Sequence, residues 1–115
     1  MENRRSSLVT LLAKRTDDAA IKWAPGPLEE SYQVGIGGNT ILIRRGRKGG
    51  GSPIVVVDVY DKNGAEVDSF HDEDLPPTIP SWYDTMGELL SAAKRSALGT
   101  DIVLDTILAE LQNGS

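Results

Sequence analysis

The sequence has no cysteine, only 5% aromatic residues and no long apolar run. Without cysteine there can be no disulfide, thiol nucleophile or cysteine-ligated metal site. No apolar run approaches the roughly 20 residues that a membrane-spanning helix needs, so we expect no membrane contact. The start of the chain is basic and briefly apolar but has no small-residue cleavage site, which predicts an amphipathic helix rather than a signal peptide. These absences favour a cytoplasmic protein.

The overall composition is that of one globular domain. The 115 residues are 39% hydrophobic and 25% charged, which is typical of a folded protein that buries a single core. We therefore predict one domain spanning residues 1–115. The net charge of −5 makes the chain acidic and disfavours general nucleic-acid binding, because phosphate contacts need a cationic surface.

Charge is distributed unevenly along the chain. Residues 44–50 carry four positive charges and no negative one, whereas residues 58–74 carry seven acids and one lysine. Either segment would suit a partner of opposite charge. The competing interpretation is that charged hairpins keep a small sheet soluble and its edges unpaired. Together with one tryptophan, the cations give the candidate partner-binding residues: Arg44, Arg45, Arg47, Lys48 and Trp23.

The first part of the chain predicts a helix followed by a linker. Ser6 or Ser7 is a suitable N-cap, and the apolar residues that follow share one helical face, with an end within residues 17–21. The prolines of segment 24–27 exclude a helix, so we expect a linker into a sheet there. Trp23 is expected to cover one end of the core, with ligand stacking as the alternative.

The middle of the chain predicts four antiparallel strands in a meander. Apolar and polar residues alternate, and the turns Gly-Gly-Asn and Asp-Lys-Asn-Gly are typical of hairpins, while a glycine-rich basic loop joins the second strand to the third. The third strand is the most hydrophobic and should be central. In the fourth, Val67 should face inward together with Ala65 or Phe70. The predicted strands are 31–36, 40–45, 53–60 and 65–70.

The C-terminal part predicts a stiff loop and two helices. The proline-bearing segment 71–81 should hold neither a helix nor a paired strand. A helix then begins after Ser81 and ends by Gly99, and Thr100 caps a last helix. We expect these helices to form a hairpin whose apolar stripes lie on the sheet, or on a second subunit as the alternative. The fold class is therefore α+β: a leading helix, a four-stranded antiparallel β-meander and two C-terminal helices packed on one sheet face.

No catalytic constellation is present. The single histidine, His71, could make only a weak metal site with Asp72 and Asp74, because adjacent residues at a strand end are more often solvated. Asp58 interrupts an apolar strand and could serve in acid–base chemistry, but exposure to solvent or a cross-strand pair with Arg44 or Arg45 is the favoured interpretation. We assign no catalytic, cofactor or metal-binding residue, and we lean away from an enzyme.

The glycine-rich segments do not predict a nucleotide site. A phosphate-binding loop needs a particular glycine–lysine spacing between a strand and a helix. Here the glycines join strand to strand, so no helix N-terminus is available to receive an anion.

Four elements together carry a resemblance: Trp23, the hairpin YQVGIG, the turn DKNG and the helical segment KRSALGTDIVLDTIL. In this Trp–hairpin–DxNG–helix–ALG pattern the chain resembles a group of small uncharacterised bacterial α+β proteins, a domain of unknown function. The resemblance implies a bacterial origin and supports α+β. It carries over no catalytic residue.

These features favour a non-enzymatic protein-interaction module of the immunity, antitoxin or regulatory accessory type. Small size, acidity and an exposed charged loop are the reasons. We expect a protein partner, with a homodimer as one form of it. The alternative is a nucleic-acid-associated protein that binds phosphates through the basic loop 44–48, and a small enzyme ranks last.

Overall fold

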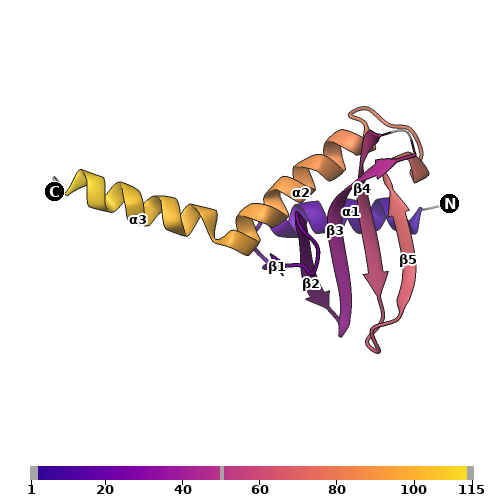
Figure 1. Cartoon of the computed structure of the whole chain (residues 1–115), viewed down its shortest axis with the longest axis horizontal. Coiled ribbons are helices and arrows are strands. Elements are labelled where there is room, and N and C mark those ends of the chain that lie inside the picture. The colour runs from indigo at the N-terminus through magenta and orange to yellow at the C-terminus, as the bar shows by residue number, and fades with distance from the viewer. Residues whose placement is uncertain (1–2, 50, 114–115) are drawn as a thin grey trace.

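The computed structural model describes residues 3–49 and 51–113, and it contains one open antiparallel sheet with helices on one side (Figure 1). The strands follow one another in the order β1-β2-β3-β4-β5, so each pairs with its neighbour in the chain. The elements are α1 (Arg4–Asp17), β1 (Ala24–Pro25), β2 (Ser31–Ile36), β3 (Asn39–Lys48), β4 (Ser52–Tyr60), β5 (Glu66–His71), the 3₁₀ helix η1 (Asp72–Asp74), α2 (Trp82–Leu98) and α3 (Thr100–Gln112).

The two predicted tight turns form as the sequence indicates. Gly37 and Gly38 adopt φ values of 60° and 82°, which suit the turn that matches the twist of a β-hairpin. In the second turn, the Asp61 carboxylate accepts the backbone N–H groups of Asn63 and Ala65 at 2.9 and 3.0 Å. These turns fix the registers and confirm the antiparallel meander.

The sheet has five strands rather than the predicted four. The segment expected to be a linker contains β1, whose Ala24 and Pro25 pair with Gln33 and Tyr32 of β2. Proline excludes a helix but is tolerated on an edge strand, where its missing N–H faces no partner. The prediction of a plain linker was therefore wrong for these two residues.

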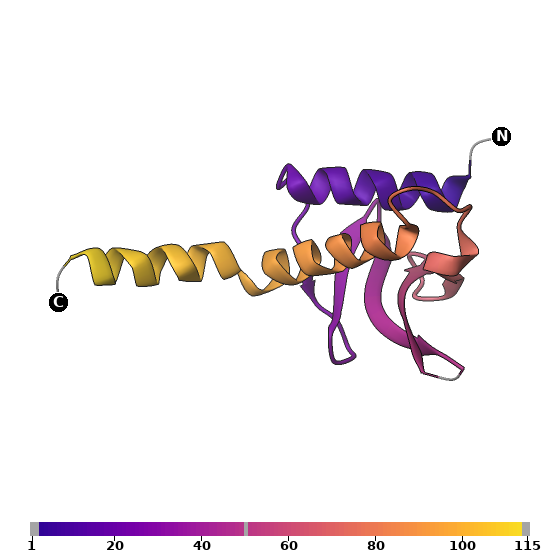
Figure 2. The same ribbon diagram turned by 90° about the horizontal axis from the view of Figure 1, so that it is seen from above.

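The core lies between one face of the sheet and helices α1 and α2, which run side by side across it (Figure 2). Alternation in the two central strands places Ile43, Val55 and Val57 on this face, each fully buried. The largest fully buried side chain is that of Trp23, at 1% exposure. This burial confirms the expectation that the tryptophan belongs to the core.

Val67 does not face inward as predicted. The pairing of β4 with β5 shifts between Val59 and Tyr60, so Val67 falls at a bulge and is 60% exposed. Alternation from Phe70, three residues further on, also places Val67 on the opposite face of the sheet. Phe70, the other inward candidate, is buried at 2% exposure.

Several predicted ends are displaced. Asn3, not Ser6 or Ser7, caps α1, because its Oδ1 accepts the Ser6 N–H at 3.0 Å. A short helix, η1, forms in the loop predicted to contain none, since the prolines begin only after it. The Ser81 cap and the left-handed Gly99, with φ of 62°, confirm both predicted ends of α2. Gly99 rather than Thr100 occupies the N-cap of α3.

The predicted helical hairpin does not form. Only Gly99 separates α2 from α3, whereas antiparallel helices need a connection of about 2–5 residues to reverse the chain. Instead α3 continues away from the sheet, as Figures 1 and 2 show. No residue of α3 is buried, so the expectation that both C-terminal helices pack on the sheet holds for α2 alone.

Candidate functional site

The basic segment, residues 44–48, belongs to β3 and its pairing with β4 rather than to a loop. Lys48 pairs with Ser52 across the hairpin. Gly50, which the prediction included in this segment, lies outside the described residues. The structure therefore places the four candidate cations along one strand, where alternate side chains point to opposite faces of the sheet. They do not form a single patch.

Arg44 is committed to an internal ion pair. Its Nε donates to Asp58 Oδ2 at 2.8 Å, and the Ser69 hydroxyl donates to the other carboxylate oxygen at 2.6 Å. Asp58 is only 2% exposed, and the hydrogen bond to it raises the pKa of Arg44. The predicted cross-strand pair is confirmed, and this carboxylate is buried in a satisfied network rather than open to solvent.

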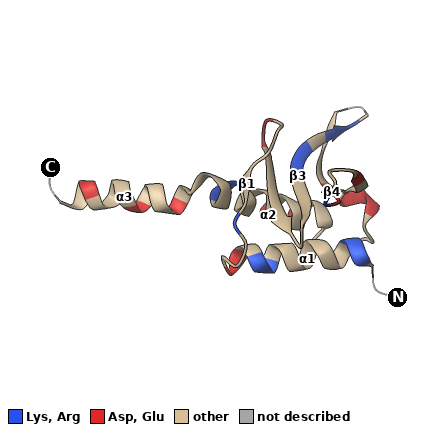
Figure 3. Cartoon of the chain, turned by 90° about the horizontal axis from the view of Figure 1, so that it is seen from below, with Lys and Arg blue, Asp and Glu red and all other residues tan. Residues whose placement is uncertain are grey.

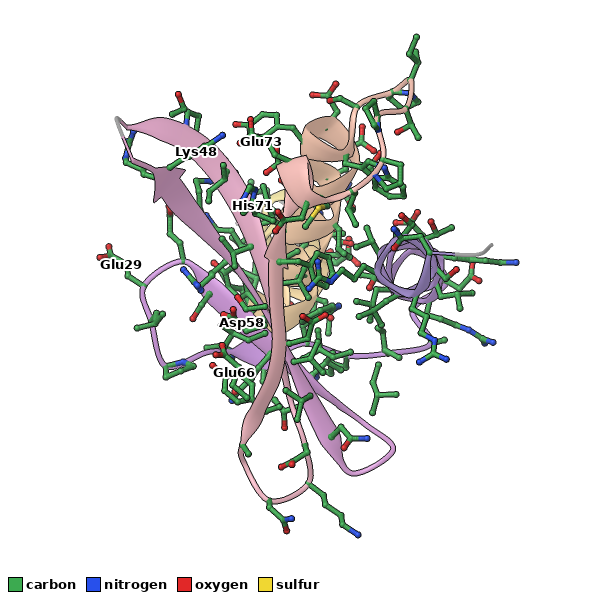
Figure 4. The ribbon with its side chains drawn as sticks, turned by 90° about the vertical axis from the view of Figure 1, so that its right-hand side faces the viewer. Glu29, Lys48, Asp58, Glu66, His71 and Glu73 are labelled. Carbon is green, nitrogen blue, oxygen red and sulfur yellow. The ribbon has the colours of Figure 1, made fainter. Side chains whose placement is uncertain are left out.

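Lys48 is also paired, but at the surface. Its Nζ lies 2.8 Å from Glu73 Oε1, and the two side chains are labelled in Figure 4. This hydrogen bond raises the pKa of Lys48 and lowers that of Glu73. Arg47 turns back to the hairpin, where its Nη1 donates to the Gly51 carbonyl at 2.8 Å.

Arg45 differs from the other three cations in its surroundings. It lines a shallow groove beside α2 together with Asp84 and Glu88. Arg95 lines the same groove, so its charged residues are two arginines and two acids, and an approaching phosphate would meet carboxylates as well as guanidinium groups. The basic segment as a whole presents much less free positive charge than its sequence suggests.

Trp23 offers no surface to a partner in the folded chain. Its indole N–H donates to Thr16 Oγ1 and its backbone N–H to Ser96 Oγ, both at 2.9 Å. These contacts join the end of α1 to the end of α2 through the tryptophan.

The segment around His71 serves local structure. Glu73 N–H donates to His71 Nδ1, and His71 N–H donates to Asp74 Oδ2, which together cap η1. Asp72 turns inward, where its Oδ1 accepts the Val55 N–H at 3.0 Å. Among the residues that the structure describes, no three histidine, cysteine or acidic side chains are grouped to hold a metal ion.

The apolar face of α3 remains exposed to solvent in the folded chain. Five aliphatic side chains at helical spacing, each 47–69% exposed, form it. Their positions give a stripe at the i, i+3, i+4, i+7 spacing that is characteristic of a helix that packs against another surface. We call this stripe the α3 face, and its residues are Val103, Leu104, Ile107, Leu108 and Leu111.

Charge on α3 is of one sign only. The helix carries three acids and no base (Figure 3). Arg95 at the end of α2 donates a hydrogen bond to Asp101 at the beginning of α3. The other two acids of α3 are Asp105 and Glu110. The α3 face is therefore an uncharged stripe on an otherwise acidic helix.

The sequence predicts the α3 stripe but not the surface that covers it. The periodicity of residues 103–111 predicts an apolar face, and the predicted helical hairpin would place that face on the sheet, with a second subunit as the alternative. Packing on the sheet is wrong, because no residue of α3 is buried. The signal that could have prevented this is the single glycine between the two helices, because one residue leaves no room for a reversal.

Within the described ranges, no helix combines the length and the apolar character needed to cross a bilayer. Comparisons with family models, curated proteins and solved structures gave no significant match.

Proposed function

We propose that this protein is a non-enzymatic protein-interaction module that binds its partner through the α3 face. The observation that carries the proposal is the exposure of that face: all five of its aliphatic side chains are uncovered on a helix with no buried residue. Contiguous exposed apolar surface of this kind is typical of a protein–protein interface. An isolated helix of about 13 residues is also marginal in water, so a partner that covers the stripe would stabilise it.

The charged groups support a binding role rather than a catalytic one. Asp58 and Asp72 are buried, but each is engaged in hydrogen bonds that hold strands or loops. The immunity, antitoxin and regulatory accessory classes are the kinds of small binding protein that fit these features.

Nucleic-acid binding through residues 44–48 ranks second. A phosphate contact would have to displace Glu73 from Lys48, and Arg44 would have to leave Asp58. Counterion release on phosphate binding needs free cations, and pairing within the protein removes that driving force.

The test is capture of a partner by the tagged full chain from a lysate of its own source organism, read by mass spectrometry. Ile107→Glu places a charge in the α3 face and should abolish capture of a stoichiometric partner. Ala109→Glu places the same charge on the opposite side of the helix and should retain it. The proposal fails if wild type captures nothing, or if both variants capture the same protein as wild type.

A further inference from the structure

Acidic side chains flank the α3 face on both sides. On a helix of 3.6 residues per turn, Asp101 and Asp105 flank the stripe on one side in the first half of α3. Glu110 flanks it on the other side in the last turn. The stripe itself carries no charge.

We infer that the α3 face binds the same face of a second copy of this chain, with the two helices antiparallel. The inference rests on the proposed function and names the partner. An apolar stripe is complementary to itself. A two-fold axis perpendicular to the helix, through the middle of the stripe, places the stripe of one copy against the stripe of the other.

Parallel pairing is disfavoured by the helix dipoles. In a parallel pair the two positive helix ends lie side by side, and so do the two negative ends. Antiparallel pairing sets each positive end beside a negative end, because the first half of each helix lies along the last half of its partner.

The N-terminal end of α3, next to Gly99, gives a second reason for the antiparallel arrangement. No side chain caps the first turn of α3, and no basic residue lies in its last turn. Antiparallel pairing brings Glu110 of one copy to the end of the other helix where backbone N–H groups are unpaired. An acid is stabilised at that positive end.

The size of the α3 face matches a small dimer interface. A half-exposed aliphatic side chain leaves roughly 100 Å² uncovered, so the five together leave roughly 500 Å². Two such faces bury about 1,000 Å², which is near the lower limit for a specific interface. We therefore expect self-association in the range of about 1–100 µM.

The shape of the molecule leaves room for this pairing. The radius of gyration is 16.0 Å, compared with about 13 Å for a compact chain of this length. The difference reflects α3, which projects clear of the sheet and the other helices (Figure 1). In the antiparallel pair the two globular bodies lie at opposite ends of helices about 20 Å long and do not collide.

The first test measures the mass of the full-length chain by sedimentation equilibrium between about 1 and 500 µM, a span that brackets the expected dissociation constant. Wild type and Ala109→Glu should shift from the 12.4 kDa monomer toward twice that mass. Ile107→Glu should weaken dimerisation at least about 30-fold, because it would desolvate a carboxylate at the seam. Neither variant should change the thermal midpoint of the monomer, because α3 contributes no buried side chain.

The second test fixes the orientation. The natural chain has no cysteine, so Asp101→Cys and Gln112→Cys, made in separate chains, each carry a single thiol on one flank of the stripe. A short bis-maleimide should join an Asp101→Cys chain to a Gln112→Cys chain. It should join Gln112→Cys chains to one another far less, because the antiparallel pair holds those ends apart.

Each of the following results contradicts a different part of the inference. A wild-type chain that stays monomeric at 500 µM excludes a second copy, while the proposed function survives if capture of another protein is still lost in Ile107→Glu. A dimer that Ile107→Glu leaves intact uses another surface. Efficient cross-linking of Gln112→Cys to itself excludes the antiparallel arrangement.

Discussion

Arg5 at the beginning of α1 donates two hydrogen bonds to the Asp68 carboxylate of β5, from Nε at 2.9 Å and from Nη2 at 2.6 Å. The same guanidinium lies 5.2 Å above the ring of the buried Phe70. The pair joins elements that are 63 positions apart in the sequence, so it closes the fold from its first helix to its last strand. The hydrogen bond from Arg5 lowers the pKa of Asp68.

Replacing this carboxylate should weaken the fold in a pH-dependent way. Asp68→Asn should lower the free energy of unfolding at pH 7 by about 1 kcal/mol, the upper range for a half-exposed pair. Because the pKa of Asp68 is lowered in the fold, the stabilisation is present above the unfolded value of about 4 and is lost as pH falls through the lower folded value. Urea denaturation at pH 7 and near pH 2.5 should show the wild type and the variant converging in acid. Glu88→Gln, an exposed acid on α2 without an ion pair among those described, should show no such difference.

The buried Asp58–Arg44 pair should couple strongly. Asp58→Leu strands a half-buried guanidinium and removes the acceptor of the Ser69 hydroxyl, and Arg44→Met strands a buried carboxylate. Each single change should cost about 3 kcal/mol. The double variant should cost much less than the sum, because it leaves no unpaired charge. A double-mutant cycle by chemical denaturation measures the coupling, and strict additivity would contradict the pair's role.

Trp23 should be shielded from solvent. The chain has two tryptophans, so Trp82→Phe leaves Trp23 as the only indole. Its fluorescence emission should be blue-shifted and resistant to iodide, since the side chain is 1% exposed. Denaturant should shift the emission to the red and restore quenching. Efficient quenching in the native state would show instead that Trp23 is exposed to solvent.

Nucleic-acid affinity should be low even without added salt. Two of the four cations of residues 44–48 are paired with acids, so we expect no retention of the full chain on single- or double-stranded DNA at about 20 mM salt, where phosphate contacts are strongest. Glu73→Gln frees Lys48 and should increase retention slightly. Strong wild-type binding that is lost on replacing Arg44, Arg45, Arg47 and Lys48 by alanine would favour the second-ranked function.

Local signals in the sequence predicted most of the fold. The hairpins follow from glycine and asparagine turns, α2 follows from its Ser81 cap and Gly99 end, and the Asp58–Arg44 pair follows from their places on neighbouring strands. Each depends on residues close together in the chain or on a fixed strand register. Such features can be predicted from spacing alone.

What could not be predicted depends on packing between distant elements. The two-residue strand β1 is too short to leave a pattern, and the bulge at Val67 depends on how β5 meets β4. The basic segment was overrated as a site because Glu73, which neutralises Lys48, lies 25 positions further along the chain. An apolar stripe likewise predicts that a helix is covered without indicating what covers it.

Because α3 is separate from the core, the chain has two parts: residues that the fold requires, and a helix whose apolar face the fold does not require. Substitutions at positions 103–111 leave the core untouched, because no side chain there is buried within the monomer. Natural selection for a folded body would therefore not preserve this stripe. Chains with the same body could diverge along this one helix and acquire different assembly partners without any loss of fold.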